Sequence, residues 1–102
     1  MRLFTRPSTF HGNPKGYALN QAGHAVLGAL WVYFGFPLWI WAAGYLAWEA
    51  AQMWLFDASL WDALEDASFA IGGALAVTTW PIVAVLAGFW ASGIARRVEE
   101  RT

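Results

Sequence analysis

Three long apolar stretches follow one another along the chain. They cover residues 18–36 (ALNQAGHAVLGALWVYFGF), 37–56 (PLWIWAAGYLAWEAAQMWLF) and most of 60–95. A helix that crosses the hydrocarbon core of a bilayer needs about 20 predominantly apolar residues. The pattern therefore predicts an all-α membrane protein with three transmembrane helices over these three ranges.

Local signals define the ends of these helices. Proline disrupts a helix interior but suits a helix start, so the break at Gly35–Pro37 predicts that the first two helices form a tight hairpin. Ser59 with Asp62 three residues later is a variant of the capping box, which predicts a helix start at Leu60. Pro81 predicts a kink in the third helix, with a re-entrant bend as the alternative.

Charged segments flank the apolar region. The sequence predicts three segments: a basic soluble arm (residues 1–17), the three-helix transmembrane domain (residues 18–95) and a charged tail (residues 96–102). With three spans, the arm and the tail lie on opposite sides of the membrane and carry equal numbers of Lys and Arg. The positive-inside rule then leaves the orientation undecided. A re-entrant bend at Pro81 would return the tail to the side of the arm.

The composition supports the membrane assignment. Of the 102 residues, 59% are hydrophobic and 13% are charged, against roughly a quarter charged in an ordinary soluble domain. The eight tryptophans are typical of anchors at a membrane–water interface, with an aromatic ligand box as the alternative. The expected location is the bacterial inner membrane, with the lipid bilayer as partner. The net charge of −1 and the lack of a basic stripe argue against nucleic-acid binding.

Small residues recur inside the apolar stretches. They are Gly28, Gly72 and Gly73, with the series Ala84, Gly88 and Ser92 at four-residue spacing. Small side chains let helices approach closely. We interpret them as packing positions, and the last series also offers a face for a homo-oligomer.

Polar residues gather where the first predicted helix starts, the second ends and the third starts. With three spans these positions lie at one membrane face. Glu49 is the most informative residue, because a carboxyl group within an apolar helix must face protein and find a partner. The predicted polar cluster comprises Asn20, Gln21, His24, Glu49, Gln52, Asp62 and Asp66.

Several chemical roles are open to this cluster. It can be a structural lock in which Glu49 bonds to His24 or Gln52, a cation-binding site, or a proton relay through His24, Glu49 and Asp66. No HExxH or other metal signature occurs, and cysteine is absent, so we expect neither a bound metal nor another cofactor. No serine lies in a nucleophile elbow, so no catalytic residue is assigned and a non-enzymatic protein is expected.

The motifs NQAGHAVLGAL (Asn20–Leu30), WEAAQ (Trp48–Gln52) and DASLWDALEDASFAIGGALA (Asp57–Ala76) resemble the pattern of VanZ-like small membrane proteins. In that family a His begins one span, Glu-x-x-Gln ends the next, and Asp residues followed by Gly open the third. The resemblance assigns His24, Glu49, Gln52, Asp62, Asp66 and Gly73 to a shared polar cluster. It also implies a phage or prophage origin. Asn20 and Gln21 depart from the Asp-Lys that the family tends to have there, and the chain is one span shorter than typical members.

A second resemblance rests on layout. About a hundred residues, three spans and a short charged tail resemble a class I phage holin, which permeabilises the inner membrane at lysis. The sequence therefore predicts a non-enzymatic membrane protein of VanZ-like pattern. A holin-like lysis protein is the first alternative, and a cation- or proton-binding membrane module is the second.

Overall fold

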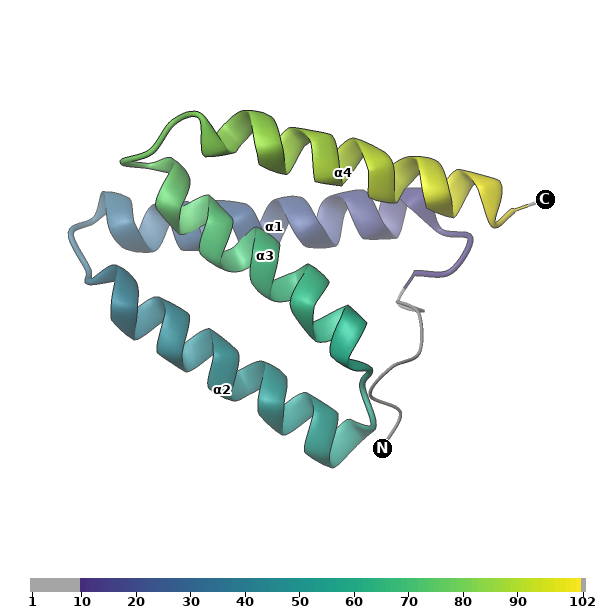
Figure 1. Ribbon diagram of the computed structural model, residues 1–102, viewed down its shortest axis with the longest axis horizontal. Coiled ribbons are helices and arrows are strands. Elements are labelled where there is room, and N and C mark those ends of the chain that lie inside the picture. Colours follow the sequence, from purple (N-terminus) through teal and green to yellow (C-terminus); the bar gives the residue numbers. More distant parts are fainter. Residues whose placement is uncertain (1–9, 102) are drawn as a thin grey trace.

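The computed structural model describes residues 10–101 and contains four α-helices in this part of the chain (Figure 1). They are α1 (Pro14–Tyr33), α2 (Leu38–Phe56), α3 (Leu60–Ala76) and α4 (Ile82–Glu99). Short connections of three to five residues join them, as is usual in a helical domain. The result is one small helical assembly in which each helix contacts at least two others.

Side-chain caps explain two of the helix starts. Asn13 precedes α1, its side-chain Oδ1 accepts the Gly16 N–H at 3.0 Å, and Pro14 occupies the first helical position. Ser59 precedes α3, and its Oγ accepts the Asp62 N–H at 3.0 Å. α3 begins at Leu60, where the sequence predicts it. Asp57 ends α2 in the left-handed conformation, at φ 56°.

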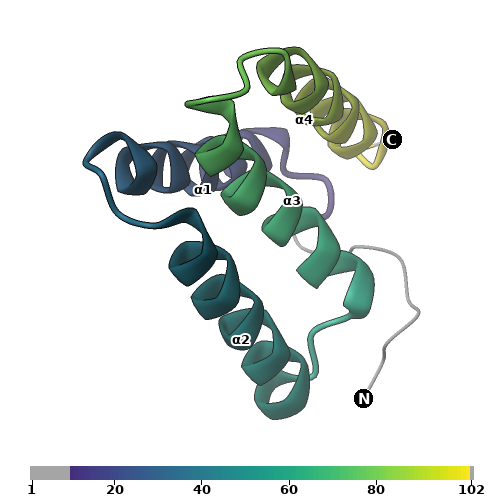
Figure 2. The same ribbon diagram turned by 60° about the vertical axis from the view of Figure 1, so that its left-hand side comes forward.

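α1 and α3 cross at the centre of the molecule, with α2 and α4 on opposite sides of α3 (Figures 1 and 2). The crossing is close because glycines lie in it. A Cβ at Gly73 would overlap the backbone of Ala25, and a Cβ at Gly28 would overlap the carbonyl oxygen of Ala70. Buried Gly72 faces Leu86 of α4. Packing is therefore the role of these three glycines, as predicted.

Tryptophan side chains add ties between helices. Trp41 of α2 donates its indole N–H to the Ala70 carbonyl of α3 at 2.8 Å. Trp90 of α4 donates to the Ala18 carbonyl of α1 at 3.0 Å. A buried or half-buried indole needs a hydrogen-bond partner, and a helix carbonyl can supply a second lone pair. These two residues therefore act as structural links.

The interior consists mainly of small side chains. Its hydrophobic members are Ala63, Ala67, Ala70 and Ala74 of α3, with Tyr17 and Phe69. Many large apolar side chains point outward instead; Trp39, Trp54 and Trp80 are each more than 70% exposed. The series Ala84, Gly88 and Ser92 also lies on the exposed side of α4, so it does not pack within the chain. An unusually large share of the apolar composition is thus on the surface.

The three predicted transmembrane helices are not present. Within residues 10–101, none of the four helices combines the length and the apolar character that crossing a bilayer requires. α2 contains Glu49 and Gln52, and α4 contains Arg96, Arg97 and Glu99, all of which reduce the mean hydropathy of their helices. The prediction of an integral protein of the inner membrane is therefore wrong, and so are the membrane and transmembrane descriptions that depended on it.

The predicted third helix, residues 60–95, is two helices. The chain leaves the helical path after Ala76, reverses at residues 77–81, and α4 returns beside α3 and α1 (Figure 1). The expected kink at Pro81 is wrong because the break is complete: Pro81 is the residue before a new helix. The tight hairpin of the first two helices is also wrong, since α2 diverges from α1 after the short turn (Figure 2).

Candidate functional site

The seven residues of the predicted polar cluster lie together at one end of the molecule. Six of them line a pocket of about 290 Å³ between α1, α2 and α3: Asn20, His24, Glu49, Gln52, Asp62 and Asp66. The seventh, Gln21, is buried behind the pocket and contacts two of its residues. Although the prediction of three transmembrane helices was wrong, the start of α1, the end of α2 and the start of α3 do lie close together.

A chain of hydrogen bonds connects α1 to α3. The Gln21 amide Nε2 donates to Asp66 Oδ1 at 2.7 Å. Its Oε1 lies 3.1 Å from His24 Nδ1. An amide oxygen only accepts, so this arrangement requires the His24 proton on Nδ1. Asp66, Gln21 and His24 thus form an ordered polar link between the two helices.

Asp62 has a structural task at the start of α3. Ser59 Oγ accepts the Asp62 N–H, which caps the helix, and donates to Asp62 Oδ2 at 2.8 Å, which holds the Ser59 hydroxyl in place. The carboxylate also lies in the first turn, near the positive end of the helix dipole. Asp62 therefore contributes both to the cap and to the negative charge beside the pocket.

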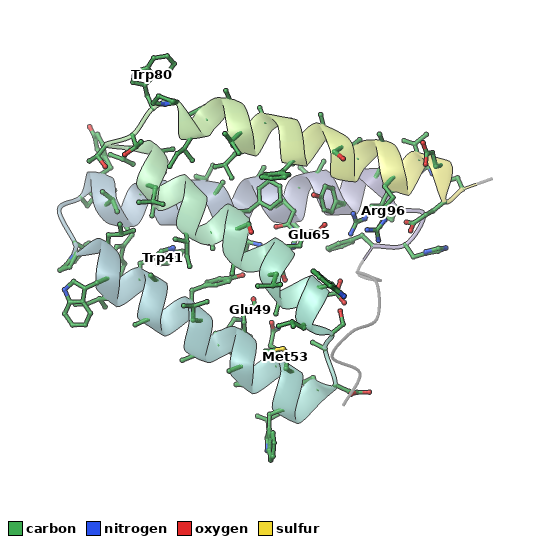
Figure 3. The ribbon with its side chains drawn as sticks, in the orientation of Figure 1. Trp41, Glu49, Met53, Glu65, Trp80 and Arg96 are labelled. Atoms are coloured by element: carbon green, nitrogen blue, oxygen red, sulfur yellow. The ribbon has the colours of Figure 1, made fainter. Side chains whose placement is uncertain are left out.

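Glu49 differs from the other cluster residues. It is 3% exposed, and its Oε1 is buried with no hydrogen-bond partner among residues 10–101. Figure 3 shows Glu49 on the side of α2 that faces α3. Burial is the main cause that raises the pKa of Glu49 from 4.5 to about 7, and the nearby Asp66 carboxylate adds to it. The Tyr45 hydroxyl opposes the shift through a hydrogen bond to the Glu49 side chain.

Two neighbours of Glu49 share its environment. Burial raises the pKa of Asp66, and the hydrogen bond from Gln21 opposes that rise. Burial, followed by the charge of Glu49, raises the pKa of Tyr45. Its hydroxyl therefore stays protonated at neutral pH and can donate. The pocket holds several acidic groups whose charged forms are disfavoured when no cation is near.

The sequence did not identify the aromatic wall of the pocket. Tyr45, Trp48, Phe56 and Phe10 complete its lining, with Ala58. Tyr45 also makes an edge-to-face contact with His24, at 5.7 Å between ring centroids. The i, i+4 spacing from Tyr45 to Glu49 was the available signal, because residues at that spacing share a helix face. Phe10 precedes the first helix, and no local pattern connected it to this site.

A metal site receives no support from this geometry. Among residues 10–101, no group of three or more His, Cys, Asp or Glu side chains has the arrangement to bind a metal ion. Asp66 and Asp62 already accept hydrogen bonds from Gln21 and Ser59. The pocket is therefore better suited to a ligand that brings its own N–H or O–H donors.

A second polar group lies elsewhere, among α1, α3 and α4. Arg97 is fully buried, and its guanidinium Nη2 donates to Glu65 Oε1 at 2.9 Å. The guanidinium also lies 4.0 Å from the centroid of the Tyr17 ring. The sequence placed Arg97 in a charged, solvated tail, but α4 continues to Glu99 and buries it. This group joins helices and does not line the Glu49 pocket.

Comparisons with protein-family models, with curated proteins and with solved structures found no match to this chain. The VanZ-like resemblance and the phage origin therefore stay predictions from three short motifs. The holin resemblance rested on three spans, and the four-helix fold removes that basis.

Proposed function

We propose that this chain is a non-enzymatic binding protein whose Glu49 pocket binds a small organic cation of the ammonium type. The observation that carries the proposal is that Glu49 lines the pocket while its buried Oε1 has no hydrogen-bond donor among the described residues. A buried acceptor without a donor is costly, so a ligand N–H at this position would remove a cost as well as form a bond.

The surroundings of Glu49 favour a positive charge. The Asp62 and Asp66 side chains also line the pocket, and both raise the pKa of Glu49 by repelling its charged form. Trp48 and Tyr45 present aromatic rings on the same pocket, and such rings attract ammonium groups. The volume of about 290 Å³ is near the lower end of the range for small-molecule pockets. A small amine therefore fits both the charge and the size.

The structural lock is the second candidate role, and a specific observation supports it for part of the cluster. Gln21 of α1 bridges His24 and Asp66 and so joins α1 to α3, whereas Ser59 bonds to Asp62 within the start of α3. Glu49 is outside both arrangements. We therefore assign the lock to the α1–α3 side of the pocket and the binding role to Glu49.

Titration of the protein with butylammonium at pH 8 tests the proposal. The NMR shift of the Trp48 indole N–H reports the binding. We expect saturable binding that weakens about tenfold or more in Glu49→Gln, because each 1.4 kcal/mol of lost interaction is tenfold in affinity. Asp57→Asn is the matched control: it removes an acidic group near the end of α2 that does not line the pocket. Butan-1-ol has a similar shape without the charge. Equal binding of the alcohol, or unchanged amine binding in Glu49→Gln, would contradict the proposal.

The exposed apolar surface bears on the two partner predictions, a lipid bilayer and a homo-oligomer. Monomeric proteins rarely expose large continuous apolar patches without a binding role. Trp39, Trp54 and Trp80 are the most exposed tryptophans of the chain. The bilayer prediction refers to this tryptophan surface and the homo-oligomer prediction to the exposed series Ala84, Gly88 and Ser92, and both are separate from the Glu49 pocket.

A further inference from the structure

The Glu49 carboxyl group faces acidic and neutral groups from every helix packed around it. His24 of α1, Tyr45 of α2, and Asp62 and Asp66 of α3 are the titratable groups that line the same pocket. No Lys or Arg lines it in the part of the chain that the structure describes. His24 is the only one of these groups that can become positive, and its Nδ1 lies beside Gln21 Oε1.

An empty pocket therefore has no fixed cation to neutralise Glu49. Ionising a carboxyl group that is 3% exposed, beside two other carboxyl groups, is unfavourable both because water is excluded and because like charges repel. The pKa of Glu49, about 7, reflects both causes. At slightly acid pH the empty site therefore favours Glu49 as the neutral acid.

We propose that the pocket exchanges one proton for one organic ammonium ion, with Glu49 as the group that releases the proton. The inference rests on the proposed function and adds that cation binding is coupled to proton release. On binding, the Glu49 O–H bond breaks and its proton goes to bulk water. The resulting carboxylate accepts an N–H of the ammonium ion, which keeps all its own protons. One positive charge enters as one leaves, so the net charge of the pocket does not change.

This exchange predicts a specific pH dependence. Below the pKa of free Glu49, binding must displace a proton, so the affinity for the cation rises tenfold for each pH unit. Above that pKa the site is already ionised and the affinity is constant. For a pKa of about 7, the rise ends near neutral pH. A site that binds the cation without exchange would show no such slope.

Calorimetric titration of the full chain with butylammonium at pH 6, in two anionic buffers of different ionisation enthalpy, measures the protons released. We expect up to about 0.9 proton per bound cation at pH 6, the limit set by the fraction of Glu49 that is protonated, and almost none at pH 9. Asp57→Asn should release the same number as the wild type. Glu49→Gln should bind more weakly and release none. Wild-type binding without proton release at pH 6 would overturn the exchange but leave the proposed function standing, whereas no binding at pH 8 would overturn both.

A second measurement needs no comparison of affinities. Carbon NMR of the labelled Glu49 carboxyl group follows its titration directly in the folded wild-type protein. We expect a midpoint near pH 7 without ligand and a midpoint at lower pH when butylammonium is present. A midpoint near the ordinary 4.5 in the free protein would overturn the exchange.

Discussion

At the scale of single residues, Glu49 connects the stability of the fold to pH. A carboxyl group whose pKa is about 7 in the folded chain and 4.5 in the unfolded chain keeps a proton that the unfolded chain has lost. Stability therefore falls as the pH rises from about 4.5 to about 7, and it changes no further with this group above that range. Each pKa unit corresponds to about 1.4 kcal/mol, so the difference between 4.5 and about 7 gives a loss of about 3–4 kcal/mol.

Glu49→Gln tests this dependence, because it keeps the shape of the neutral acid and cannot ionise. We expect the free energy of unfolding to match that of the wild type near pH 4.5 and to exceed it by about 3 kcal/mol at pH 8. Urea unfolding at several pH values measures the difference. A difference that does not vary with pH would show that Glu49 titrates normally. Asp57→Asn again provides the control, since Asn is well tolerated in the left-handed conformation found there.

The sequence identified the residues of the cluster but not the hydrogen-bond partners of each one. Glu49 stands out in a sequence because a carboxyl group in an apolar helix is expensive, and this argument holds whatever surrounds the helix. Whether a partner reaches it depends on contacts across helices. Gln21, predicted as a neighbour, turned out to be the bridge between His24 and Asp66, and Glu49 was left without such a bond at its Oε1.

At the scale of the elements, the crossing of α1 and α3 depends on glycines that no helix propensity would select. Gly73→Ala would place a methyl group against the Ala25 backbone, which cannot move aside as a flexible side chain could. We expect the free energy of unfolding to fall by about 2–3 kcal/mol, because overpacking forces the helices apart. Gly23→Ala in α1 is the control, since open space surrounds that position. It should be neutral or stabilising by up to about 1 kcal/mol. Similar thermal unfolding of the two variants would contradict the close crossing.

Local signals predicted the helix starts better than the helix lengths. The Ser59 cap and the proline at residue 37 act within a few residues, and α3 and α2 begin beside them. The apolar stretch 67–95 has no comparable local signal that specifies where a helix ends and how the chain continues. A proline inside such a stretch is compatible with a kink, a re-entrant bend or a reversal. The outcome depends on whether the following segment can pack back, and here Trp90 and Leu86 of α4 contact α1 and α3.

At the scale of the whole molecule, composition was the least reliable guide. The prediction of transmembrane helices came from three long apolar stretches and was supported by the hydrophobic fraction, which counts Ala and Trp equally with Leu and Ile. Here alanines fill the interior of α3, and several tryptophans lie at the surface or bond to helix carbonyls. Total apolar content therefore did not determine where the apolar surface lies or how long each helix is.

The contact of Arg97 with Glu65 and Tyr17 ties the end of the chain to the rest of the molecule, since these residues belong to α4, α3 and α1. Breaking a buried ion pair by removing one partner leaves the other charge poorly compensated, which costs about 3–5 kcal/mol when both are fully buried. The Glu65 side chain is 21% exposed, so we expect Arg97→Ala to lower the free energy of unfolding by a smaller amount, about 2–4 kcal/mol.

Arg96→Ala is the matched control for this loss, because it removes the same type of side chain one position earlier. Arg96 is 35% exposed and pairs with Glu100 at 3.4 Å within the last turn of α4. Such an i, i+4 pair contributes about 0.5 kcal/mol or less. Urea unfolding should therefore separate the two variants clearly, and the Tyr17 ring signals should shift more in Arg97→Ala, which removes the guanidinium 4.0 Å from the ring centroid. Equal losses in the two variants would mean that α4 is not held to α1 and α3 through Arg97.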